Sequence, residues 1–400
     1  MNKYCSIFFY EGYVGIAPTV INATKLLVRN GYSVNIYGRD NKYAEPGEMG
    51  EKVRIFYFRE LSNKFEFLSY MGLKKDSSGF KFIIYAIQCL IEVLKNSRAS
   101  EQKKQINIGI DVYGSIAALL SFYLFKQKFL FLSLELRELH KFSSIIGSLA
   151  KLAYKKSAAA IVQDEDRFAT LCEQYEYRHP KVFYLPNSPL NEPNSFTDEN
   201  SANYFREKFN LSQERFPYII LQAGTIDEIF LSKPIAEAFA SIDNGCALIF
   251  HEPFPKPLTH PYIKSIQSVN SKNLFISTDP VPYQEVDKIY ASATICLALY
   301  QAYDDNCSKI AMASGKLAHS LKMGKPVIVN DLPSLRELTE KYQFGFIIKE
   351  PFDPEEIKMA IEAIVKDYEM YSRNAKLCFE AEFDFGKKME PILEFMENVE

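Results

Sequence analysis

The stretch Ala313-Ser-Gly-Lys-Leu-Ala-His-Ser-Leu-Lys-Met-Gly-Lys-Pro-Val-Ile328 indicates the fold class of this 400-residue chain. It predicts a helix that begins at Ser314 and Gly315 and ends at Gly324. The apolar run that follows is typical of a parallel strand covered on both faces. Because the first amides of a helix point at its N-terminal end and Lys316 lies beside them, this stretch is suited to holding a phosphate.

Strand-like and helix-like runs alternate along the whole chain, which predicts α/β units with parallel sheets. The expected strands are Cys5–Phe9, Ser33–Tyr37, Val53–Phe58, Ile106–Ile110, Phe129–Leu134, Ala158–Val162, Val182–Leu185, Tyr218–Leu221, Ala247–Phe250, Leu274–Ile276, Thr294–Leu299, 327–329 and Phe346–Ile348. A polar segment, residues 187–216, indicates a linker, and the tail from Tyr371 to Glu400 indicates an amphipathic helix.

This pattern and length predict two Rossmann-like halves with a ligand site in the cleft between them. The first domain is expected to span residues 1–190 together with a C-terminal helix at 376–400, and the second is expected to span 213–375.

Composition excludes several classes of protein. The net charge is −3, from 47 basic and 50 acidic residues, so nothing indicates a nucleic-acid partner. Five scattered histidines and the lack of a Cys-x-x-Cys pair argue against a structural metal site. The start of the chain has no signal-peptide layout, and the apolar stretch Phe80–Leu94 is shorter than the roughly 20 residues of a membrane span. We therefore expect a cytoplasmic protein.

Two loops of the first half are candidates for contact with an acceptor. The segment Glu11-Gly12-Tyr-Val-Gly15 follows the first strand, and its spacing disfavours a dinucleotide site, so it is either a plain turn or a loop that contacts substrate. Glu135, Glu138 and His140 follow a later strand, where charge faces either water or a ligand. The next helix carries several lysines, which suit a solvated face or, alternatively, a weak contact with a membrane surface.

Loops of the second half follow strands whose carboxyl ends share one edge of the predicted sheet. The small-residue turn Leu221–Ile226, with Gly224 and Thr225, permits close approach of a ligand. The other loops carry His251, Val281 and Asn306. A nucleobase held by backbone at 279–283 and a phosphate at 314–316 would suit this edge. The alternative for Lys316 is an exposed helix lysine, although its place in the first turn opposes the helix dipole.

The chain resembles the GT-B glycosyltransferases, in particular the retaining family 4 group. The motifs that carry the resemblance are Ser314–Ile328, Ile161-Val-Gln-Asp-Glu-Asp-Arg167 and Leu185-Pro-Asn-Ser188. The resemblance implies two Rossmann-like domains that face a central cleft and a last helix that crosses back to the N-terminal domain. It implies a nucleoside-diphosphate-sugar donor, such as a UDP- or GDP-sugar, and no metal. The acceptor would be a hydroxyl of a glycan, a lipid-linked glycan or a protein.

Residues at the family's motif positions depart from the usual pattern. Two glutamates that have seven residues between them are replaced by Ala311 and His319, and the second position commonly binds the donor ribose. The usual Arg and Lys that hold the donor phosphates are replaced by Thr225 and Phe230. The missing charge would come from Lys316, Lys309 or Lys233.

These residues support one leading hypothesis and two alternatives. In the leading hypothesis Lys316 and the amides near Ser314 and Gly315 bind the diphosphate, and Glu135 with the Gly12–Gly15 loop meets the acceptor or the transferred sugar. His319 would contact the ribose, the turn at Val281 the base, and Glu138 the acceptor. The alternatives are a catalytically inactive GT-B scaffold that partners an active transferase and, less favoured, a sugar-nucleotide epimerase.

Overall fold

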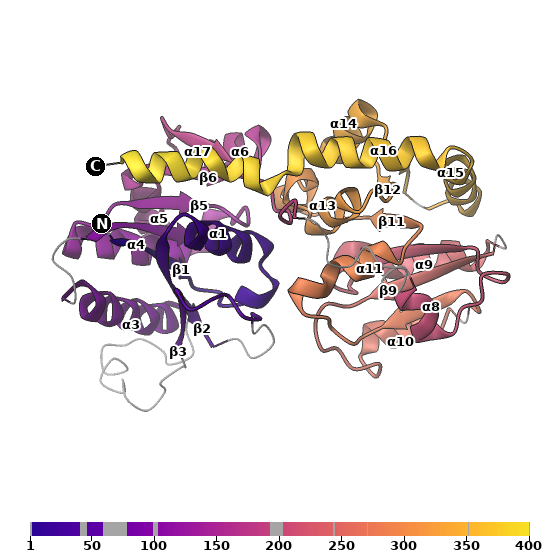
Figure 1. Cartoon of the computed structure of the whole chain (residues 1–400), viewed down its shortest axis with the longest axis horizontal. Coiled ribbons are helices and arrows are strands. Elements are labelled where there is room, and N and C mark those ends of the chain that lie inside the picture. The colour runs from indigo at the N-terminus through magenta and orange to yellow at the C-terminus, as the bar shows by residue number, and fades with distance from the viewer. Residues whose placement is uncertain are drawn as a thin grey trace. The chain divides into compact units, whose positions relative to one another are not determined.

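The buried apolar runs form two separate parallel sheets, of seven and six strands. The computed structural model describes residues 2–40, 46–58, 78–98, 103–192, 203–242, 245–269, 271–350 and 352–399. The chain divides into two compact units, which are drawn in Figure 1. The N-terminal unit comprises Met1–Pro186 and Gly386–Glu400, and the C-terminal unit comprises Asn187–Phe385.

The sheet of the N-terminal unit has the order β3-β2-β1-β4-β5-β6-β7, and every neighbouring pair is parallel. Its strands are β1 (Asn2–Phe9), β2 (Tyr32–Arg39), β3 (Val53–Phe58), β4 (Lys103–Ile110), β5 (Phe129–Leu132), β6 (Ala159–Val162) and β7 (Val182–Tyr184). Its helices are α1 (Pro18–Arg29), α3 (Ser78–Arg98), α4 (Asp111–Phe125), α5 (Ser144–Lys156), α6 (Glu165–Tyr175) and α17 (Phe385–Asn398). Every residue of β5 and β6 is buried, as expected for strands covered on both faces.

The sheet of the C-terminal unit has the order β10-β9-β8-β11-β12-β13 and is also parallel throughout. Its strands are β8 (Tyr218–Ala223), β9 (Cys246–His251), β10 (Leu274–Ser277), β11 (Ile295–Ala298), β12 (Val327–Asn330) and β13 (Gly345–Ile348). Its helices are α8 (Tyr204–Phe209), α9 (Ser232–Ala240), α10 (Pro261–Gln267), α11 (Val286–Ala291), α12 (Asp305–Ser308), α13 (Gly315–Lys322), α14 (Pro333–Tyr342), α15 (Pro354–Lys366) and α16 (Tyr368–Cys378). The order turns back at β8 and β11, and such a switch point is where open α/β sheets bind ligands.

The last helix, α17, belongs to the N-terminal unit although α16 belongs to the C-terminal one. A π-helical turn, Phe379–Phe383, separates the two helices. The Phe395 ring lies 5.4 Å from the Phe183 ring, and Glu397 forms an ion pair with Lys3. An apolar contact and a charge pair therefore attach α17 to strands β7 and β1.

The expected linker at 187–216 is wrong in part, because it contains helix α8. Phe205 is fully buried, and its ring lies 5.9 Å from that of His251, so α8 packs on the C-terminal unit. The polar composition of the segment as a whole concealed these aromatic residues. Residues 193–202 of the expected linker lie outside the described residues.

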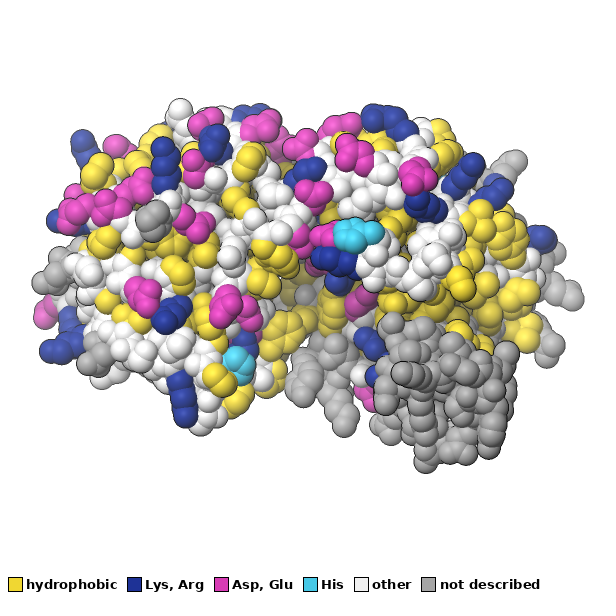
Figure 2. Space-filling view, turned by 180° about the vertical axis from the view of Figure 1, so that it is seen from behind, with side chains coloured by type: hydrophobic (Ala, Val, Ile, Leu, Met, Phe, Trp, Pro, Cys, Tyr) yellow, Lys and Arg dark blue, Asp and Glu magenta, His cyan; other side chains and the backbone are white. Residues whose placement is uncertain are grey.

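Two further features concern the distribution of surface charge and the length of the helices. In the face shown in Figure 2, basic side chains are interspersed with acidic ones, in keeping with the near balance of charge along the chain. Among the described residues, no helix has both the length and the apolar character that crossing a membrane requires.

Candidate functional site

Helix α13 begins as the sequence predicts, with Ser314 as its N-cap. The Ser314 hydroxyl accepts a hydrogen bond from the Leu317 amide at 3.1 Å and also bonds to the hydroxyl of Tyr300. The amides of Gly315 and Lys316 have no partner within the helix, because the first turn lacks preceding carbonyls. This capped terminus follows η5 (Ala311–Ala313) and leads by way of α13 to strand β12.

The Lys316 ammonium is enclosed by protein and has no hydrogen-bond partner. Nζ lies 4.1 Å from the centroid of the Phe230 ring and 4.6 Å from that of Tyr300, so two aromatic faces hold the cation. The residue as a whole is only half-buried, which places the enclosed part at the end of the side chain. Burial lowers the pKa of Lys316 to about 7. An unpartnered buried ammonium is costly, and an anion beside it would remove that cost.

Gly224 makes room for this ammonium at the end of β8. Its φ is +126°, and a Cβ built there would lie 3.3 Å from Lys316 Cε and 3.5 Å from Nζ. Its amide donates to the carbonyl of His251 at 3.0 Å, which ties the ends of β8 and β9 together. In the resembled family, the phosphate-binding cations lie in the turn after this strand. In this chain, Lys316 of α13 approaches that turn instead.

Lys316 differs from the other two lysines named as replacements for the missing charge. Lys233 lies in α9, is half-buried, and pairs with Glu237 at 3.6 Å. Lys309 follows the short helix α12 and is half-buried. Of these three lysines, Lys316 is the one that approaches Gly224.

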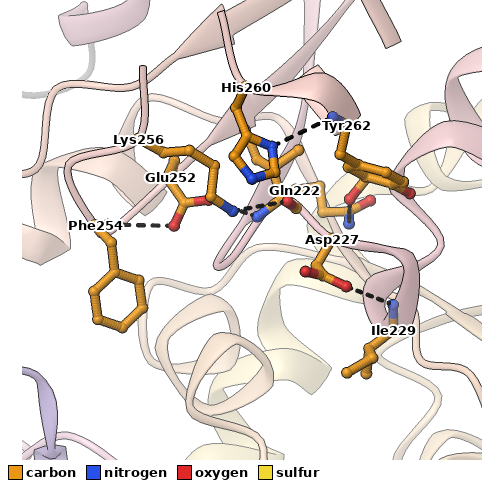
Figure 3. A network of polar contacts seen from close by, with 10 residues as sticks. Gln222, Asp227, Ile229, Glu252, Phe254, Lys256, His260 and Tyr262 are labelled. Carbon is orange, nitrogen blue, oxygen red and sulfur yellow. Dashed lines mark hydrogen bonds and ion pairs between the residues drawn. The ribbon is translucent and has the colours of Figure 1, made fainter. Parts of the chain in front are cut away.

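A buried carboxylate fixes the loop that carries Phe230. Glu252 is fully buried, accepts the Ile226 amide at 2.8 Å and pairs with Lys256 at 2.7 Å. Figure 3 shows Lys256 reaching back to Glu252 beside Gln222, whose amide donates to the Phe230 carbonyl at 2.8 Å. This network stabilises the turn after β8 and so positions the Phe230 ring that contacts Lys316.

His251, predicted as a donor contact, points into the core of the C-terminal unit. It is buried, and its Nδ1 lies 2.9 Å from the Ser277 hydroxyl. Burial lowers its pKa to about 4, with a further contribution from Lys208. Its ring is therefore neutral near pH 7. Any contact with a donor would have to come from its backbone, and that role stays a prediction.

His319, predicted to contact the ribose, is buried in α13 and lies 3.2 Å from Asp287. Its ring stacks on that of Tyr290 at 5.2 Å. Burial raises the pKa of Asp287, but the hydrogen bonds and charges of His319 and Lys322 outweigh this and hold that pKa well below its usual range. Lys316 and His319, although one turn apart, have different surroundings in the structure.

The remaining predicted donor contacts lie in loops of the same unit. Thr225 follows Gly224 directly, and Val281 packs against the apolar core between β10 and η4 (Tyr283–Glu285). Asn306 lies in α12, which Asp304 caps by accepting the Cys307 amide at 2.8 Å. Each of these loops follows the carboxyl end of a strand of one sheet, as the sequence predicts.

The Leu185-Pro-Asn-Ser188 motif supports the start of α13, a role that sequence reasoning missed. The Asn187 amide donates to the Met312 carbonyl at 2.9 Å, and its side chain donates to the Ala313 carbonyl at 3.1 Å. The side-chain nitrogen would lie 3.6 Å from a Cβ at Gly315. Asn187 therefore holds the turn that presents the amides of α13, and only its place in a resembled motif marked it.

In the N-terminal unit the predicted acceptor loop has a structural explanation. Gly12 has a φ of +76°, and a Cβ there would lie 2.1 Å from the Arg39 carbonyl oxygen, so the turn requires glycine. Gly15 is buried in the 3₁₀ turn Val14–Ile16. Glu138 pairs with Lys141 at 2.9 Å and with His140 at 3.2 Å.

Glu135 lies beside a buried carboxyl that was assigned no role from the sequence. The Asp111 side chain accepts the Glu135 amide at 3.2 Å and the Leu134 amide at 2.7 Å. Burial and the neighbouring charge of Glu11 raise the pKa of Asp111 to about 8. The only sequence signal for Asp111 is an acidic residue placed directly after a strand. Within the described ranges, no group of three His, Cys, Asp or Glu residues is arranged to hold a metal ion.

Comparison with known proteins finds likeness in structure alone. Neither family models nor curated protein sequences match the chain. Sucrose-phosphate synthase from Thermosynechococcus elongatus is 14% identical, with a TM-score of 0.70 over 100% of this chain and 99% of that one. Anabaena HepE in complex with UDP-glucose is 13% identical, with a TM-score of 0.69 over 99% and 100% of the two chains. WaaG, a glycosyltransferase involved in lipopolysaccharide biosynthesis, is 14% identical, with a TM-score of 0.60 over 99% of each. The chain therefore has the GT-B fold of these glycosyltransferases, as its sequence motifs lead us to expect.

Proposed function

We propose that this chain is a glycosyltransferase that moves a sugar from a nucleoside-diphosphate sugar to a hydroxyl acceptor. The observation that carries the proposal is the enclosed, unpartnered ammonium of Lys316 at the start of α13, against Gly224. A cation and free helix amides at one point form a site for a diphosphate. The UDP and UDP-glucose found with Anabaena HepE support a nucleotide sugar as the donor.

In this proposal the C-terminal unit stabilises the leaving group. Lys316 and the amides of Gly315 and Lys316 would bind the diphosphate, on which negative charge builds as the bond to the sugar breaks. The rings of Phe230 and Tyr300 hold the cation in position when no diphosphate is bound. The diphosphate in turn replaces the hydration that Lys316 lacks, so binding raises the pKa of this lysine.

The finer assignments rest on the resemblance. The donor is proposed to be a UDP- or GDP-sugar, with its base against Val281, its ribose near His319, and Gly224, Thr225, His251 and Asn306 lining the site. Glu135, Glu138 and the Gly12–Gly15 loop are proposed to serve the acceptor, which is a glycan, a lipid-linked glycan or a protein. Retention, independence of metal, membership of family 4 and the domain limits 1–190, 213–375 and 376–400 also stay proposals.

A second candidate is a catalytically inactive partner of an active transferase. It is favoured by the residues at the family's two glutamate positions, because Ala311 has no polar group and His319 is engaged by Asp287. The two candidates differ in a measurable way, since only an enzyme turns over a donor.

A donor screen tests the proposal. The melting temperature would be measured with UDP, GDP, ADP and their sugars, and hydrolysis of the same donors would be followed over time. We expect one nucleotide to raise the melting temperature and its sugar to be turned over. Lys316→Ala should lower kcat/KM, with a rise of about 2–4 kcal/mol in the activation free energy, as the loss of an oxyanion-binding donor does. The matched control is Lys233→Ala, which removes a lysine of the same unit that pairs with Glu237, and it should leave turnover unchanged. Nucleotide binding without turnover would favour the inactive partner, and no response to any nucleotide would contradict the proposed donor site.

A further inference from the structure

Four large apolar side chains are exposed together at the C-terminal ends of helices α3 and α4. They are Ile91, Leu94, Tyr123 and Leu124, with exposed fractions of 45%, 37%, 46% and 61%. The described part of the chain exposes ten large hydrophobic side chains in all, so these two helix ends hold four of them. Single exposed apolar residues are ordinary, whereas a group of them on one surface marks an interaction site.

The topology of the N-terminal unit places these two helix ends at one edge of its sheet. Helix α3 leads into β4 and α4 leads into β5, and these parallel neighbours both begin at the amino edge. The two helices also pack on each other within the unit drawn in Figure 1. Their exposed apolar side chains therefore lie at the amino edge, opposite the carboxyl edge where the loops of Gly12 and Glu135 begin.

Both helices are apolar on the side that faces solvent as well as on the side that faces the core. In α3, Cys89 and Val93 are buried while Ile91 and Leu94 are exposed. The last turn of α4 reads Phe122-Tyr-Leu-Phe125. The outer face of a surface helix normally carries polar or charged residues. These outer faces therefore suit contact with an apolar phase better than contact with water.

Lysines lie around these apolar side chains. Lys126 and Lys128 follow α4, while Lys155 and Lys156 end α5, which packs on α4. All four are exposed, and none of them has an acidic partner among the described residues. The surface is therefore basic as well as apolar.

Acidic side chains are scarce at the same helix ends. In the last two turns of α3, α4 and α5 the sequence has a single acid, Glu92, which pairs with Lys95 at 2.6 Å. The charges of the four other lysines are therefore left for a partner that is itself negative. The balanced charge of the chain as a whole does not extend to this edge.

A buried amide holds the two lysines that follow α4 at the surface. Gln127 lies between them and is buried. Its Oε1 accepts hydrogen bonds from the Ser121 hydroxyl at 2.8 Å and the Asn107 side chain at 3.1 Å. Its Nε2 donates to Gln105 at 2.8 Å. These bonds fix the turn that joins α4 to β5, so the flanking lysines are preorganised beside the apolar side chains of α4.

We infer that this amino-edge surface, which comprises the exposed apolar side chains of α3 and α4 and the four lysines around them, docks on an anionic lipid bilayer. The apolar side chains would enter the boundary between headgroups and acyl chains, and the lysines would bind the headgroup phosphates. A second copy of the chain fits less well, because a symmetric contact would bring the same lysines face to face. Docking at this edge leaves the loops at the carboxyl edge uncovered.

Co-sedimentation of the full chain with lipid vesicles tests the inference. The probes are vesicles of phosphatidylcholine alone and vesicles of phosphatidylcholine and phosphatidylglycerol in equal parts. We expect binding to the anionic vesicles to be at least about tenfold stronger. It should weaken but persist at about 0.5 M salt, because salt screens the lysines and not the apolar contact. Equal affinity for both kinds of vesicle, or no binding to either, would overturn the inference.

Two double variants of the surface locate the contact. Tyr123→Ser with Leu124→Ser removes apolar area, and Lys126→Gln with Lys128→Gln removes charge. Each double variant should weaken binding to the anionic vesicles about tenfold or more. All four side chains are exposed, so the melting temperature should stay at the native value. Native vesicle affinity in both variants would overturn the inference.

The C-terminal unit offers a matched control. Met359→Ser with Leu377→Ser removes two apolar side chains that are 60% and 51% exposed, as far from burial as those of α4. This control should bind the anionic vesicles as the native chain does. A loss as large as that of the variant in α4 would show that vesicle binding does not depend on the amino-edge surface, which would also overturn the inference.

Light scattering on the same samples identifies the competing occupant. A native chain that ignores vesicles and forms a dimer, which the Tyr123→Ser and Leu124→Ser variant dissociates, would show that the surface joins two copies. That result would contradict docking on a bilayer.

UDP-glucose turnover, measured on the same variants, separates this inference from the proposed function. It should be unchanged, because the substituted residues lie in the N-terminal unit and Lys316 lies in the other one. A chain that turns over UDP-glucose but ignores vesicles contradicts the inference alone. A chain that binds anionic vesicles but no nucleotide supports the inference and contradicts the proposed transferase.

Discussion

The affinity of this chain for UDP-glucose should fall steeply as pH rises through neutrality. The Lys316 ammonium is enclosed without a partner, and burial lowers its pKa to about 7 in the unliganded chain. Only the protonated lysine attracts the diphosphate, so apparent affinity follows the protonated fraction. That fraction is about 0.9 at pH 6 and about 0.01 at pH 9, which predicts a roughly 90-fold loss of affinity, or about 2.7 kcal/mol.

Calorimetric titration at several pH values between 6 and 9 measures this loss. UDP-glucose is the suitable ligand because its phosphates are both esterified, whereas the terminal phosphate of UDP titrates near pH 6, at about the pKa of a phosphate monoester. Lys316→Arg keeps the charge over this range, so its affinity should vary little with pH. Asp111→Asn should keep the native pH dependence, because Asp111 lies in the other unit. A flat profile in the native chain, or an equally steep one in Lys316→Arg, would show that titration of Lys316 does not control donor binding.

Three further outcomes follow from the same contacts. Lys316→Met should stabilise the unliganded chain at pH 6 by up to about 4 kcal/mol in chemical denaturation, because it removes a buried charge whose folded pKa lies below its ordinary value of 10.5. This gain in stability should shrink as pH rises from 7 towards 10.5, and a gain that does not depend on pH would contradict the lowered pKa of Lys316. Gly224→Ala should weaken UDP-glucose binding about tenfold, since φ is +126° and the new methyl group would meet the lysine; unchanged calorimetric affinity would argue against a site at this turn. Asp287→Asn should lower the free energy of unfolding by about 1–3 kcal/mol at pH 7, because it weakens contacts to His319 and Lys322. The loss should begin to diminish below the ordinary pKa of 3.8, where Asp287 of the unfolded chain becomes protonated while the native carboxyl stays ionised, and urea titrations at pH 7 and pH 3 would show it.

Local patterns predicted most of the fold. Each expected strand is present with small shifts at its ends, because the short length of these apolar runs, their β-branched and aromatic residues and the turn residues that flank them favour a strand over a buried helix. The start of α13 was predictable from Ser314, whose hydroxyl caps the helix as its residue type indicates. Helix α8 was missed because two phenylalanines were outweighed by the polar residues around them.

The candidate site was predictable only where a single segment carries it. Lys316 could be named because it lies in the first turn of a helix, but its aromatic partners could not, since Phe230 and Tyr300 come from other loops. The Asp111–Glu11 pair joins residues 100 positions apart that only the β1–β4 pairing brings together. His319 has the same limitation, because Asp287 contacts it from another helix. The predicted cleft between the two halves stays a prediction.

The most direct test of the proposed diphosphate site at Lys316 is a crystal structure of the chain with UDP-glucose bound. We expect a phosphate oxygen about 2.8 Å from Lys316 Nζ, the spacing of a charge-assisted hydrogen bond, with the amides of Gly315 and Lys316 facing the same diphosphate. A diphosphate bound elsewhere, with Lys316 still enclosed between Phe230 and Tyr300 and unpartnered, would contradict it.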